Sequence, residues 1–364
     1  MSSLQFGSLR ALTRSGVTAL RTCRLIHANS HRSIPPLGFA FDIAMLMAGP
    51  NPLPTARRAL QILEGDNPLN AKIPYILLTN GGGKSEAKRA QGLSESLGVE
   101  LHPDQIIQAH TILKDMVGKY ASSPVLVLGG KNDELRHVAE SYGFKRVYTT
   151  PDVLLWNPSV WPLQTIDPNQ MINRPSVDFS KTRIEAVLVF HDPRNWGTDV
   201  QIMLDIIQSG GIIGNPYLED HRSNPVEIIF CNPDLLWKSD FPRPRLGQGA
   251  FKESFQAVYK ALTGHAYPFV QFGKPTTPTY KYAEKVVTRL MKERYGSKAA
   301  VPSMYMIGDI AGANAAGWSS VLVHTGVFDP HLGIPPKHTP THQAPDVEAA
   351  VRWAVERAIS GAGD

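Results

Sequence analysis

Residues 73–98 read IPYILLTNGGGKSEAKRAQGLSESLG, and this run contains each piece of a strand followed by a returning helix. Ile73–Leu78 is a short apolar run of the kind that forms a buried strand. The polar turn Thr79–Gly83 follows at its carboxyl end. Ser85 predicts the N-cap of a helix whose spaced apolar residues continue to Gly98, a residue typical of helix ends. These pieces favour a parallel sheet, because parallel strands need such a crossover helix.

Strand and helix patterns alternate along the rest of the chain. Strands are expected at Gly38–Ile43, Val125–Leu128, Ala186–Phe190, Val226–Phe230, Ser303–Ile307 and Ser320–Val323. Helices are expected at Thr55–Glu64, Asp133–Tyr142, Tyr280–Arg294 and Val347–Ile359, and from Thr198 or Asp199 to Ile207. Irregular structure is expected in the proline-containing segments Trp156–Pro175 and Asp240–Gly249. The alternation predicts an α/β fold built on a parallel, doubly wound sheet.

Length and composition exclude several classes of protein. The chain has 364 residues, of which 42% are hydrophobic and 19% charged, so it is long enough for two domains and too apolar for global disorder. No apolar run reaches the roughly 18 residues of a membrane-spanning helix, so no integral membrane segment is expected. The net charge is +5, and residues 1–33 contribute five arginines without lysine or acidic residues. The remainder is near neutral (5 − 5 = 0), which argues against nucleic-acid binding.

The amino-terminal segment, residues 1–33, has the composition of a mitochondrial presequence. It is rich in arginine and serine, lacks acidic residues and intersperses leucines among the arginines. A basic amphipathic helix of this kind is read by the mitochondrial import machinery. We therefore expect a mitochondrial location, in the matrix, with cleavage between Arg24 and Ser33. A basic tail without a targeting role is the alternative.

Four polar residues stand at the ends of expected strands or in loops, namely Asp42, Thr79, Lys274 and Asp309. In an open parallel sheet the carboxyl ends of the strands face one crevice, where ligands bind. Two carboxylates there would attract Mg²⁺, and a lysine with the backbone N–H groups of Asn80–Gly83 would hold a phosphoryl group. Attack by Asp42 on a phosphoryl group screened in this way would give an aspartyl-phosphate.

Taken in order, these motifs resemble the four motifs of the haloacid dehalogenase (HAD) superfamily. The matching segments are Phe39–Ile43, Leu78–Glu86, Gly273–Pro275, Ile307–Asp309 and Ala311–Asn314. They are most similar to class IIA hydrolases, and within that class to the mitochondrial branch called after the cat-eye-syndrome region. The resemblance covers essentially residues 36–360.

The resemblance implies a Rossmann-like core with an inserted α/β cap domain. The core would comprise residues 35–100 and 262–364, and the cap residues 101–261. The separation of Thr79 and Lys274 (274 − 79 = 195) agrees with an insertion, because structureless loops of that length are uncommon. In such proteins the cap excludes water and selects the substrate. The turn Asn232–Asp234 would be a substrate loop of this cap or an ordinary turn.

The resemblance also implies a role for each site residue. Asp42 would be the nucleophile, and Lys274 the catalytic cation. The implied phosphate ligands are Thr79, Asn80, Gly81 and Lys274. The implied Mg²⁺ ligands are Asp42, the backbone carbonyl of Ala44, and Asp309. The implied activity is Mg²⁺-dependent, phosphatase-type hydrolysis of a small phosphorylated metabolite; the sequence indicates no oligomeric state.

Two departures from the family pattern put turnover in question. Motif I in the family reads Asp-x-Asp-Gly, whereas Ala44 and Met45 occupy its last two positions here. The missing aspartate serves the family as acid and base, a contribution worth ~10²–10⁴ in rate. Motif IV is also shorter than in the family and lacks a second acidic residue after Asp309. The sequence leaves open an impaired hydrolase, a catalytically inactive binding or regulatory protein of mitochondria, and a role in glycerophospholipid metabolism.

Overall fold

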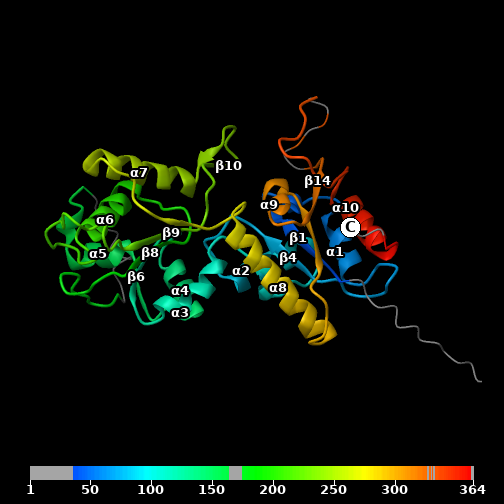
Figure 1. Cartoon of the computed structure of the whole chain (residues 1–364), viewed down its shortest axis with the longest axis horizontal. Helices are drawn as coiled ribbons and strands as arrows, with labels where there is room; N and C mark the ends of the chain where they lie inside the picture. The colour runs from blue at the N-terminus through cyan, green and yellow to red at the C-terminus, as the bar shows by residue number, and fades with distance from the viewer. Residues whose placement is uncertain (1–35, 164–173, 326–327, 329, 331–332, 362–364) are drawn as a thin grey trace, which may run out of the picture. The chain divides into compact units, whose positions relative to one another are not determined.

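The computed structural model describes residues 36–163, 174–325, 328, 330 and 333–361. The predicted presequence, residues 1–33, lies outside the described residues, and so does the stretch 164–173. Two parallel sheets organise the described chain (Figure 1). We call the six-stranded sheet with its helices the core domain, and the five-stranded sheet with its helices the inserted domain. None of the helices in the described ranges combines the length and apolar character that crossing a membrane requires.

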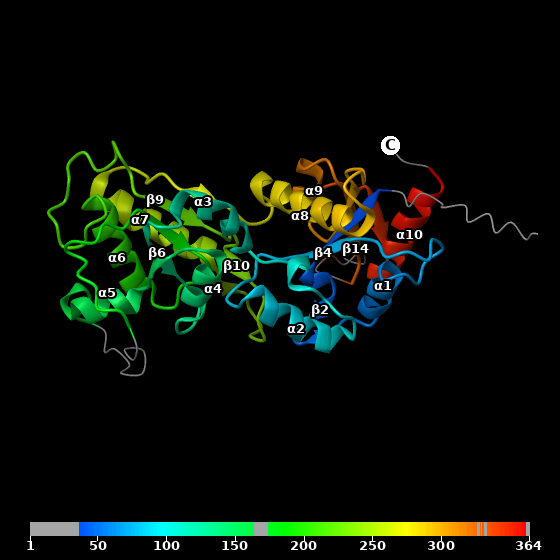
Figure 2. The ribbon, with the colours of Figure 1, turned by 90° about the horizontal axis from the view of Figure 1, so that it is seen from below.

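The core domain has helices on both faces of its sheet. Its strands, in spatial order, are β15 (His342–Ala344), β14 (Ser319–Val323), β13 (Ser303–Ile307), β1 (Leu37–Asp42), β4 (Tyr75–Leu78) and β5 (Ile106–Ile107), all parallel. Its helices are α1 (Ala56–Leu63), α2 (Glu86–Leu97), α8 (Thr277–Tyr295), α9 (Ile310–Ala315) and α10 (Val347–Ile359). Helices α1, α2 and α10 lie on one face of the sheet and α8 and α9 on the other (Figure 2). Phe39 and Phe41 pack with the first group, and Ala40 packs with the second. The predicted doubly wound sheet is confirmed.

The inserted domain repeats this architecture. Its strands, in spatial order, are β12 (Val270–Gln271), β9 (Glu227–Phe230), β8 (Ala186–Val189), β6 (Pro124–Leu128) and β7 (Arg146–Tyr148), all parallel. Its helices are α3 (Val117–Tyr120), α4 (Glu134–Tyr142), α5 (Thr150–Trp156), α6 (Trp196–Gln208) and α7 (Gln248–Thr263). Leu126 and Leu128 pack with α5, α6 and α7, and Val125 and Val127 pack with α3 and α4. This is the second α/β domain that the sequence predicts.

Short elements connect the two domains and their strands. The antiparallel pairs are β2 (Met47–Ala48) with β3 (Asn51–Pro52), and β10 (Leu236–Trp237) with β11 (Arg245–Leu246). The 3-10 helices are η1 (Ile43–Met45), η2 (Pro103–Gln105), η3 (Thr111–Met116) and η4 (Pro158–Val160).

Each parallel sheet contains a point where neighbouring strands send the chain in opposite directions. In the core domain β1 leads to β4 on one side, and β13 leads to β14 on the other. In the inserted domain β6 leads to β7, and β8 leads to β9 on the opposite side. A crevice forms outside the carboxyl ends of the strands at such a switch point, and ligands bind there in open α/β sheets. The chain therefore has two places where a ligand site is expected.

Most predicted elements lie within a few residues of their predicted bounds, and β13 and α10 coincide with them. The predicted N-cap of α2 is confirmed, because Ser85 Oγ accepts a hydrogen bond from the Lys88 N–H at 3.3 Å. Gly98 ends that helix with a φ of 65°, the left-handed conformation that favours glycine.

The predicted start of α6 is wrong. The helix begins at Trp196, before the two residues expected to cap it. Thr198 and Asp199 are buried instead, and Asp199 Oδ1 accepts a hydrogen bond from Thr150 Oγ1 at 2.5 Å. The Asp199 side chain, which the sequence suggests as a helix cap, therefore binds Thr150 at the start of α5 instead.

Both segments expected to be irregular contain regular structure. Asp240–Gly249 includes β11 and the first residues of α7, and Trp156–Pro175 includes η4. Helix α7 was not predicted, although its buried residues Phe251 and Tyr259 recur at a helical spacing. The glycines and prolines that precede this helix are residues typical of loops.

The strand pairings suggest where the two domains join. β5 pairs with β4 of the core sheet, and β12 pairs with β9 of the inserted sheet. We propose that the chain passes between domains after Ile107 and after Gln271, slightly later than the predicted cap boundaries at residues 101 and 261.

The buried carboxyl of Asp199 predicts a pH-dependent stability. Burial raises the pKa of Asp199 to about 6. The folded protein therefore binds this proton more tightly than the unfolded chain, so stability falls as the pH rises from about 4 to about 6. Asp199→Asn keeps an acceptor for Thr150 and should raise the free energy of unfolding by about 2–3 kcal/mol at pH 7, with little effect at pH 4.

Urea unfolding at the two pH values checks this prediction. The exposed Asp220→Asn, in the same domain, is the control and should change neither value. An equal effect of Asp199→Asn at both pH values would contradict the assignment of the penalty to the buried charge.

Candidate active site

The predicted site residues meet at the switch point of the core sheet. Asp42 is the last residue of β1, which pairs with both β4 and β13. Thr79 follows β4 directly, and Asp309 follows β13 after one glycine. Parallel strands present their carboxyl ends at the same edge of the sheet, so two carboxylates and a hydroxyl are grouped there. The fourth residue, Lys274, reaches this edge from the segment between β12 and α8.

Lys274 and Asp42 form a largely buried ion pair. Lys274 Nζ lies 2.6 Å from Asp42 Oδ2, and the two side chains are 8% and 24% exposed. Asp42 Oδ1 accepts a hydrogen bond from the Ala44 N–H at 3.2 Å, which fixes the other oxygen. A lysine is rarely buried unless it is paired, so Lys274 is a component of the site and not a solvated surface residue.

The side chain of Asn80 positions Lys274. Asn80 Oδ1 accepts a hydrogen bond from the Lys274 N–H at 2.7 Å, and Nδ2 donates to the Lys274 carbonyl at 3.0 Å. The same amide group donates to Asp234 Oδ1 at 3.1 Å. Asn80 is buried and its amide is fully engaged with protein groups. In this geometry its side chain holds the lysine, and only its backbone N–H is left for the predicted role of phosphate ligand.

Thr79 and Gly81 form a tight turn at the end of β4. Thr79 Oγ1 accepts a hydrogen bond from the Gly81 N–H at 3.0 Å. The hydroxyl proton of Thr79 remains available for a ligand oxygen, because Oγ1 is the acceptor here. The next two glycines pass close to side chains of the inserted domain: a Cβ on Gly83 would lie 2.7 Å from a ring carbon of His191. The turn therefore requires glycine at this approach.

Asp309 is held by two hydrogen bonds. Its Oδ1 accepts from the Gly312 N–H at 3.2 Å as the cap of α9, and its Oδ2 accepts from the Tyr280 hydroxyl at 2.5 Å. Burial, together with the negative charges of Asp309 and Asp42, raises the pKa of Tyr280 well above its ordinary value, so this tyrosine stays a donor. Tyr280 was not predicted as a site residue, because its place on the buried face of α8 resembles that of any core aromatic residue.

The donors at this site suit Mg²⁺. Asp42 and Asp309 supply carboxylate oxygens, and the Ala44 carbonyl follows Asp42 in η1. No group of three or more His, Cys, Asp or Glu side chains that could hold a metal occurs within the described ranges. Magnesium needs no such cage, because it binds through one or two carboxylates and keeps several waters.

Position 44 lacks the second carboxylate of motif I. Ala44 is exposed, whereas Met45 is buried and lies beside Gly308, the residue that follows β13. A Cβ on Gly308, which has a φ of 122°, would lie 2.8 Å from Met45 Cγ and 2.9 Å from Asp42 Cβ. Met45 therefore fills the space beside Asp42, while the neighbouring position 44 is open to solvent.

The inserted domain contributes an acidic residue to the site. Asp234 follows β9, and its hydrogen bond with Asn80 connects the two domains. Burial raises the pKa of Asp234, and the negative charges of Asp42 and Asp192 raise it further. The predicted turn Asn232–Asp234 is thus an internally hydrogen-bonded turn, with Asn232 Oδ1 accepting from the Asp234 N–H, that also contacts the site.

Removal of the Asp234 charge is expected to favour anion binding. Asp234→Asn keeps an acceptor for Asn80 but removes one negative charge near Asp42, so vanadate should bind roughly three- to tenfold more tightly at pH 8. Protonation of Asp234 has the same effect, so the difference between the two proteins should shrink as the pH falls. Equilibrium binding of vanadate to both proteins, measured at pH 8 and at lower pH values, checks this prediction. A difference that stays constant with pH would show that the charge of Asp234 is not the cause.

Comparison with known proteins identifies two matching family models. The haloacid dehalogenase-like hydrolase family matches residues 39–145, and a HAD-hydrolase-like family matches residues 271–350. The cardiolipin synthase (CMP-forming) / mitochondrial hydrolase fusion protein of Schizosaccharomyces pombe is 38% identical over 335 residues, which are 89% of this chain and 54% of that protein. A mitochondrial hydrolase of Saccharomyces cerevisiae is 36% identical over 319 residues, 80% of this chain and 88% of that protein. The chain thus spans about half of the fusion protein.

Solved structures agree with this assignment at the level of the fold. The 4-nitrophenylphosphatase of Thermotoga maritima has a TM-score of 0.56 to this structure at 17% sequence identity. The similarity covers 87% of this chain and 96% of that structure, so both parallel sheets belong to the shared fold.

Proposed function

Because the chain belongs to the haloacid dehalogenase-like hydrolase family, we propose that it is a phosphatase-type hydrolase of a small phosphorylated metabolite. The observation that supports this most is the ion pair at the core switch point, with Lys274 Nζ 2.6 Å from Asp42 Oδ2. Attack on a phosphoryl group needs a nucleophile and a fixed positive charge at one position. These two residues supply both.

In the proposed reaction Lys274 and the Thr79 hydroxyl bind oxygens of the phosphoryl group. Asp42 attacks phosphorus, and the bond between phosphorus and the substrate oxygen breaks. The leaving oxygen keeps the electron pair of that bond and takes a proton from water. A water molecule then attacks the aspartyl-phosphate, which releases inorganic phosphate and restores the Asp42 carboxylate.

The remaining residues position this machinery. Mg²⁺, when held by Asp42, the Ala44 carbonyl and Asp309, would neutralise negative charge on the phosphoryl group. Asn80 holds Lys274 through both backbone groups of the lysine, and Tyr280 holds Asp309.

Because position 44 carries no acid, the rate of hydrolysis should depend strongly on the leaving group of the substrate. An alkoxide departs poorly without a proton donor, whereas a phenolate or a carboxylate departs unaided. The proposed enzyme should therefore hydrolyse 4-nitrophenyl phosphate and acetyl phosphate with a kcat/KM at least ~10²-fold above that for glycerol 3-phosphate. Phosphate release by the full chain, with Mg²⁺ and with EDTA, tests this, and Asp42→Asn is the blank.

A catalytically inactive binding protein is the second candidate, and Ala44 and Met45 favour it. Phosphate release equal to the Asp42→Asn blank on every substrate would refute the hydrolase. Vanadate binding that persists in the wild type and is lost in Lys274→Ala would then establish the binding protein.

The relatives suggest the metabolic pathway in which the hydrolase or the binding protein would act. The fusion of a cardiolipin synthase with a mitochondrial hydrolase in S. pombe favours glycerophospholipid metabolism. We therefore include a diacylglycerol phosphate beside glycerol 3-phosphate among the substrates. Preferential Asp42-dependent hydrolysis of either, over sugar phosphates of equal leaving-group pKa, would support this setting.

We also propose that the protein is located in mitochondria, in the matrix. The arginine-rich segment 1–33 and the names of both relatives support this location. Isolated mitochondria should import the full chain to a protease-protected form that stays soluble after outer-membrane rupture. A chain without residues 1–33 should remain accessible to protease, and its import would contradict the targeting role.

A further inference from the structure

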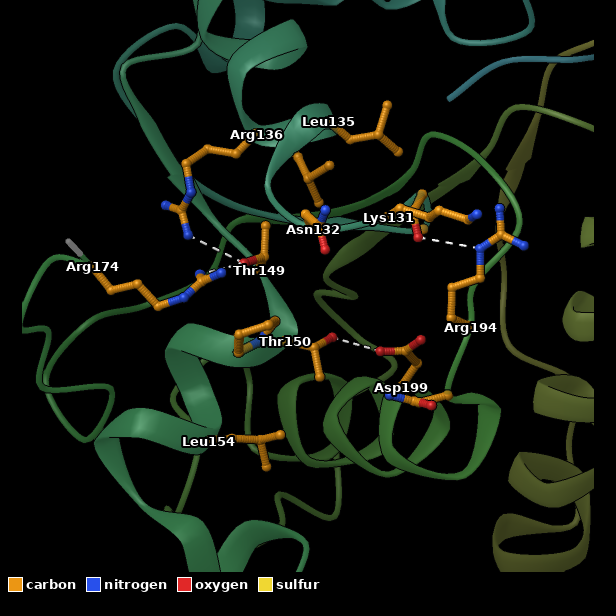
Figure 3. A pocket seen from close by; sticks show the side chains of 15 residues that line it. Lys131, Asn132, Leu135, Arg136, Thr149, Thr150, Leu154, Arg174, Arg194 and Asp199 are labelled. Atoms are coloured by element: carbon orange, nitrogen blue, oxygen red, sulfur yellow. Dashed lines mark hydrogen bonds between the residues drawn. The ribbon is translucent and has the colours of Figure 1, made fainter. Parts of the chain in front are cut away.

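A cavity of about 240 Å³ lies in the inserted domain, away from the residues of the proposed hydrolytic site. Its lining comes from three strand ends: Gly129–Asn132 after β6, Thr149–Pro151 after β7, and Arg194 and Asn195 after β8. Figure 3 shows Lys131 and Arg194 on one side of this cavity and Arg136 and Arg174 on the other. Neither Asp42 nor Lys274 lines it.

The cavity lies at the second switch point of the fold. β6 and β8 are neighbours, and their chains continue to opposite sides of the inserted sheet. The same topological rule that locates Asp42 at the β1–β13 crevice therefore predicts a ligand between the carboxyl ends of β6 and β8. The helices that begin there, α4 and α6, add the partial positive charge of their first turns.

The loop after β6 brings its backbone close to the neighbouring strand. Gly129 and Gly130 have φ values of 101° and 75°. A Cβ on Gly129 would lie 2.0 Å from the His191 carbonyl oxygen, and one on Gly130 would lie 2.9 Å from Leu135 Cδ1. Only glycine permits this turn, which leaves Lys131 at the rim of the cavity.

Two of the four cations at the cavity have no ion-pair partner among the residues that the structure describes. The inner pair is neutralised: Arg136 and Arg174 share Asp152, and Arg174 Nη2 also lies 2.7 Å from Asp133. Lys131 and Arg194 are exposed and form no ion pair with any residue of the described chain. Arg194 Nε donates to the Gly130 carbonyl at 3.2 Å, which orients its guanidinium beside the glycine turn. This rim is positively charged and suits an anion.

Another part of the lining carries groups that suit hydroxyls. Thr150 Oγ1 donates to the buried Asp199 carboxylate at 2.5 Å, and both residues line the cavity. A carboxylate is an acceptor with several lone-pair directions, so Asp199 can accept a further hydroxyl. A ligand that spans the cavity would thus place an anion at Lys131 and Arg194 and hydroxyl groups at Asp199.

We propose that this cavity is a second ligand site, which binds a small hydroxylated phosphate ester through its phosphate group. The site is separate from the Asp42 site and does not rest on the proposed phosphatase activity. Ribose 5-phosphate is a suitable probe, because it combines a phosphate monoester with free hydroxyl groups. Inorganic phosphate alone probes the cationic part of the cavity, and ribose alone probes the part that binds hydroxyl groups.

Isothermal titration of the full chain tests the site in a Lys274→Ala background, which weakens binding at the hydrolytic site. Ribose 5-phosphate should bind saturably there and more tightly than either half alone. Adding Lys131→Ala and Arg194→Ala should weaken it by at least tenfold, since each removes a charge-assisted hydrogen bond to phosphate. The matched control, Lys145→Ala with Arg183→Ala, removes two exposed cations of the same domain and should leave the affinity unchanged.

Either of two results would overturn the proposal. One is the absence of saturable binding of ribose 5-phosphate up to about 10 mM in the Lys274→Ala protein. The other is binding that the Lys131 and Arg194 substitutions leave unchanged in a folded protein, with Lys131→Glu as a second variant. Both residues are exposed, so near-ultraviolet circular dichroism should stay native. In a protein that keeps Lys274, the double variant Lys131→Ala with Arg194→Ala should have the phosphatase kcat and KM of the wild type. This result separates the test of the cavity from the test of the hydrolytic site.

Discussion

Asp42→Asn is expected to lower phosphate release by roughly 10³-fold or more, to the background of the assay. The amide cannot form the aspartyl-phosphate, and no other carboxylate within the described residues has Lys274 as an ion-pair partner. The substitution preserves side-chain volume and leaves Oδ1 able to accept from the Ala44 N–H. Turnover of 4-nitrophenyl phosphate and acetyl phosphate by the purified variant measures the effect.

A loss of folding must be distinguished from a loss of chemistry in this variant. Asp42→Asn leaves the buried Lys274 ammonium without its counter-charge, which costs about 1–3 kcal/mol of stability. The double variant Asp42→Asn with Lys274→Met removes both charges and should recover part of that stability without recovering turnover. An exposed control, Asp66→Asn, should match the wild type in rate. Residual turnover by folded Asp42→Asn above a tenth of wild type would exclude Asp42 as the nucleophile.

Ala44→Asp is expected to raise turnover of alkyl phosphates by roughly 10²–10⁴. The new carboxyl would stand two residues after Asp42, at an exposed position with room for a larger side chain. There it can protonate the leaving oxygen and then activate the attacking water. The gain should be small for 4-nitrophenyl phosphate, because nitrophenolate needs no proton to depart. The kcat/KM values for glycerol 3-phosphate and 4-nitrophenyl phosphate, compared between the two proteins, measure it.

Two further measurements make the test of Ala44→Asp specific. Ala44→Asn has nearly the same shape without an ionisable proton, so it should show no gain. The pH profile of Ala44→Asp should acquire a new limb from the added carboxyl. Equal gains for both variants would point to packing as the cause, and no gain in either would mean that buried Met45 or the short motif IV holds the site in an unproductive geometry.

The positions of most candidate site residues could be predicted because they stand at the ends of strands, which are recognisable from local apolar runs. Asp42, Thr79 and Asp309 stand within two residues of a strand end, and parallel strands bring such ends together. Tyr280 could not be predicted in this way, since a buried tyrosine on a helix gives the same apolar signal whether or not its hydroxyl contacts a carboxylate. The role of Asn80 was likewise hidden, because its partner Lys274 is 194 residues away.

Local composition and periodicity are properties of neighbouring residues, so they sufficed for the α/β class and for most strands and helices, whereas the resemblance to the HAD motifs indicated the four candidate site residues. The order of strands within a sheet is a long-range property, and the second crevice depends on it: Lys131 and Arg194 come together only because β8 pairs with β6. The hydrogen bonds of Asn80 with the backbone of Lys274, and that of Asn80 with Asp234, likewise join segments far apart in the sequence. Such contacts arise when chain segments far apart in sequence pack to bury their apolar faces, and no pattern within either segment records which partner it meets.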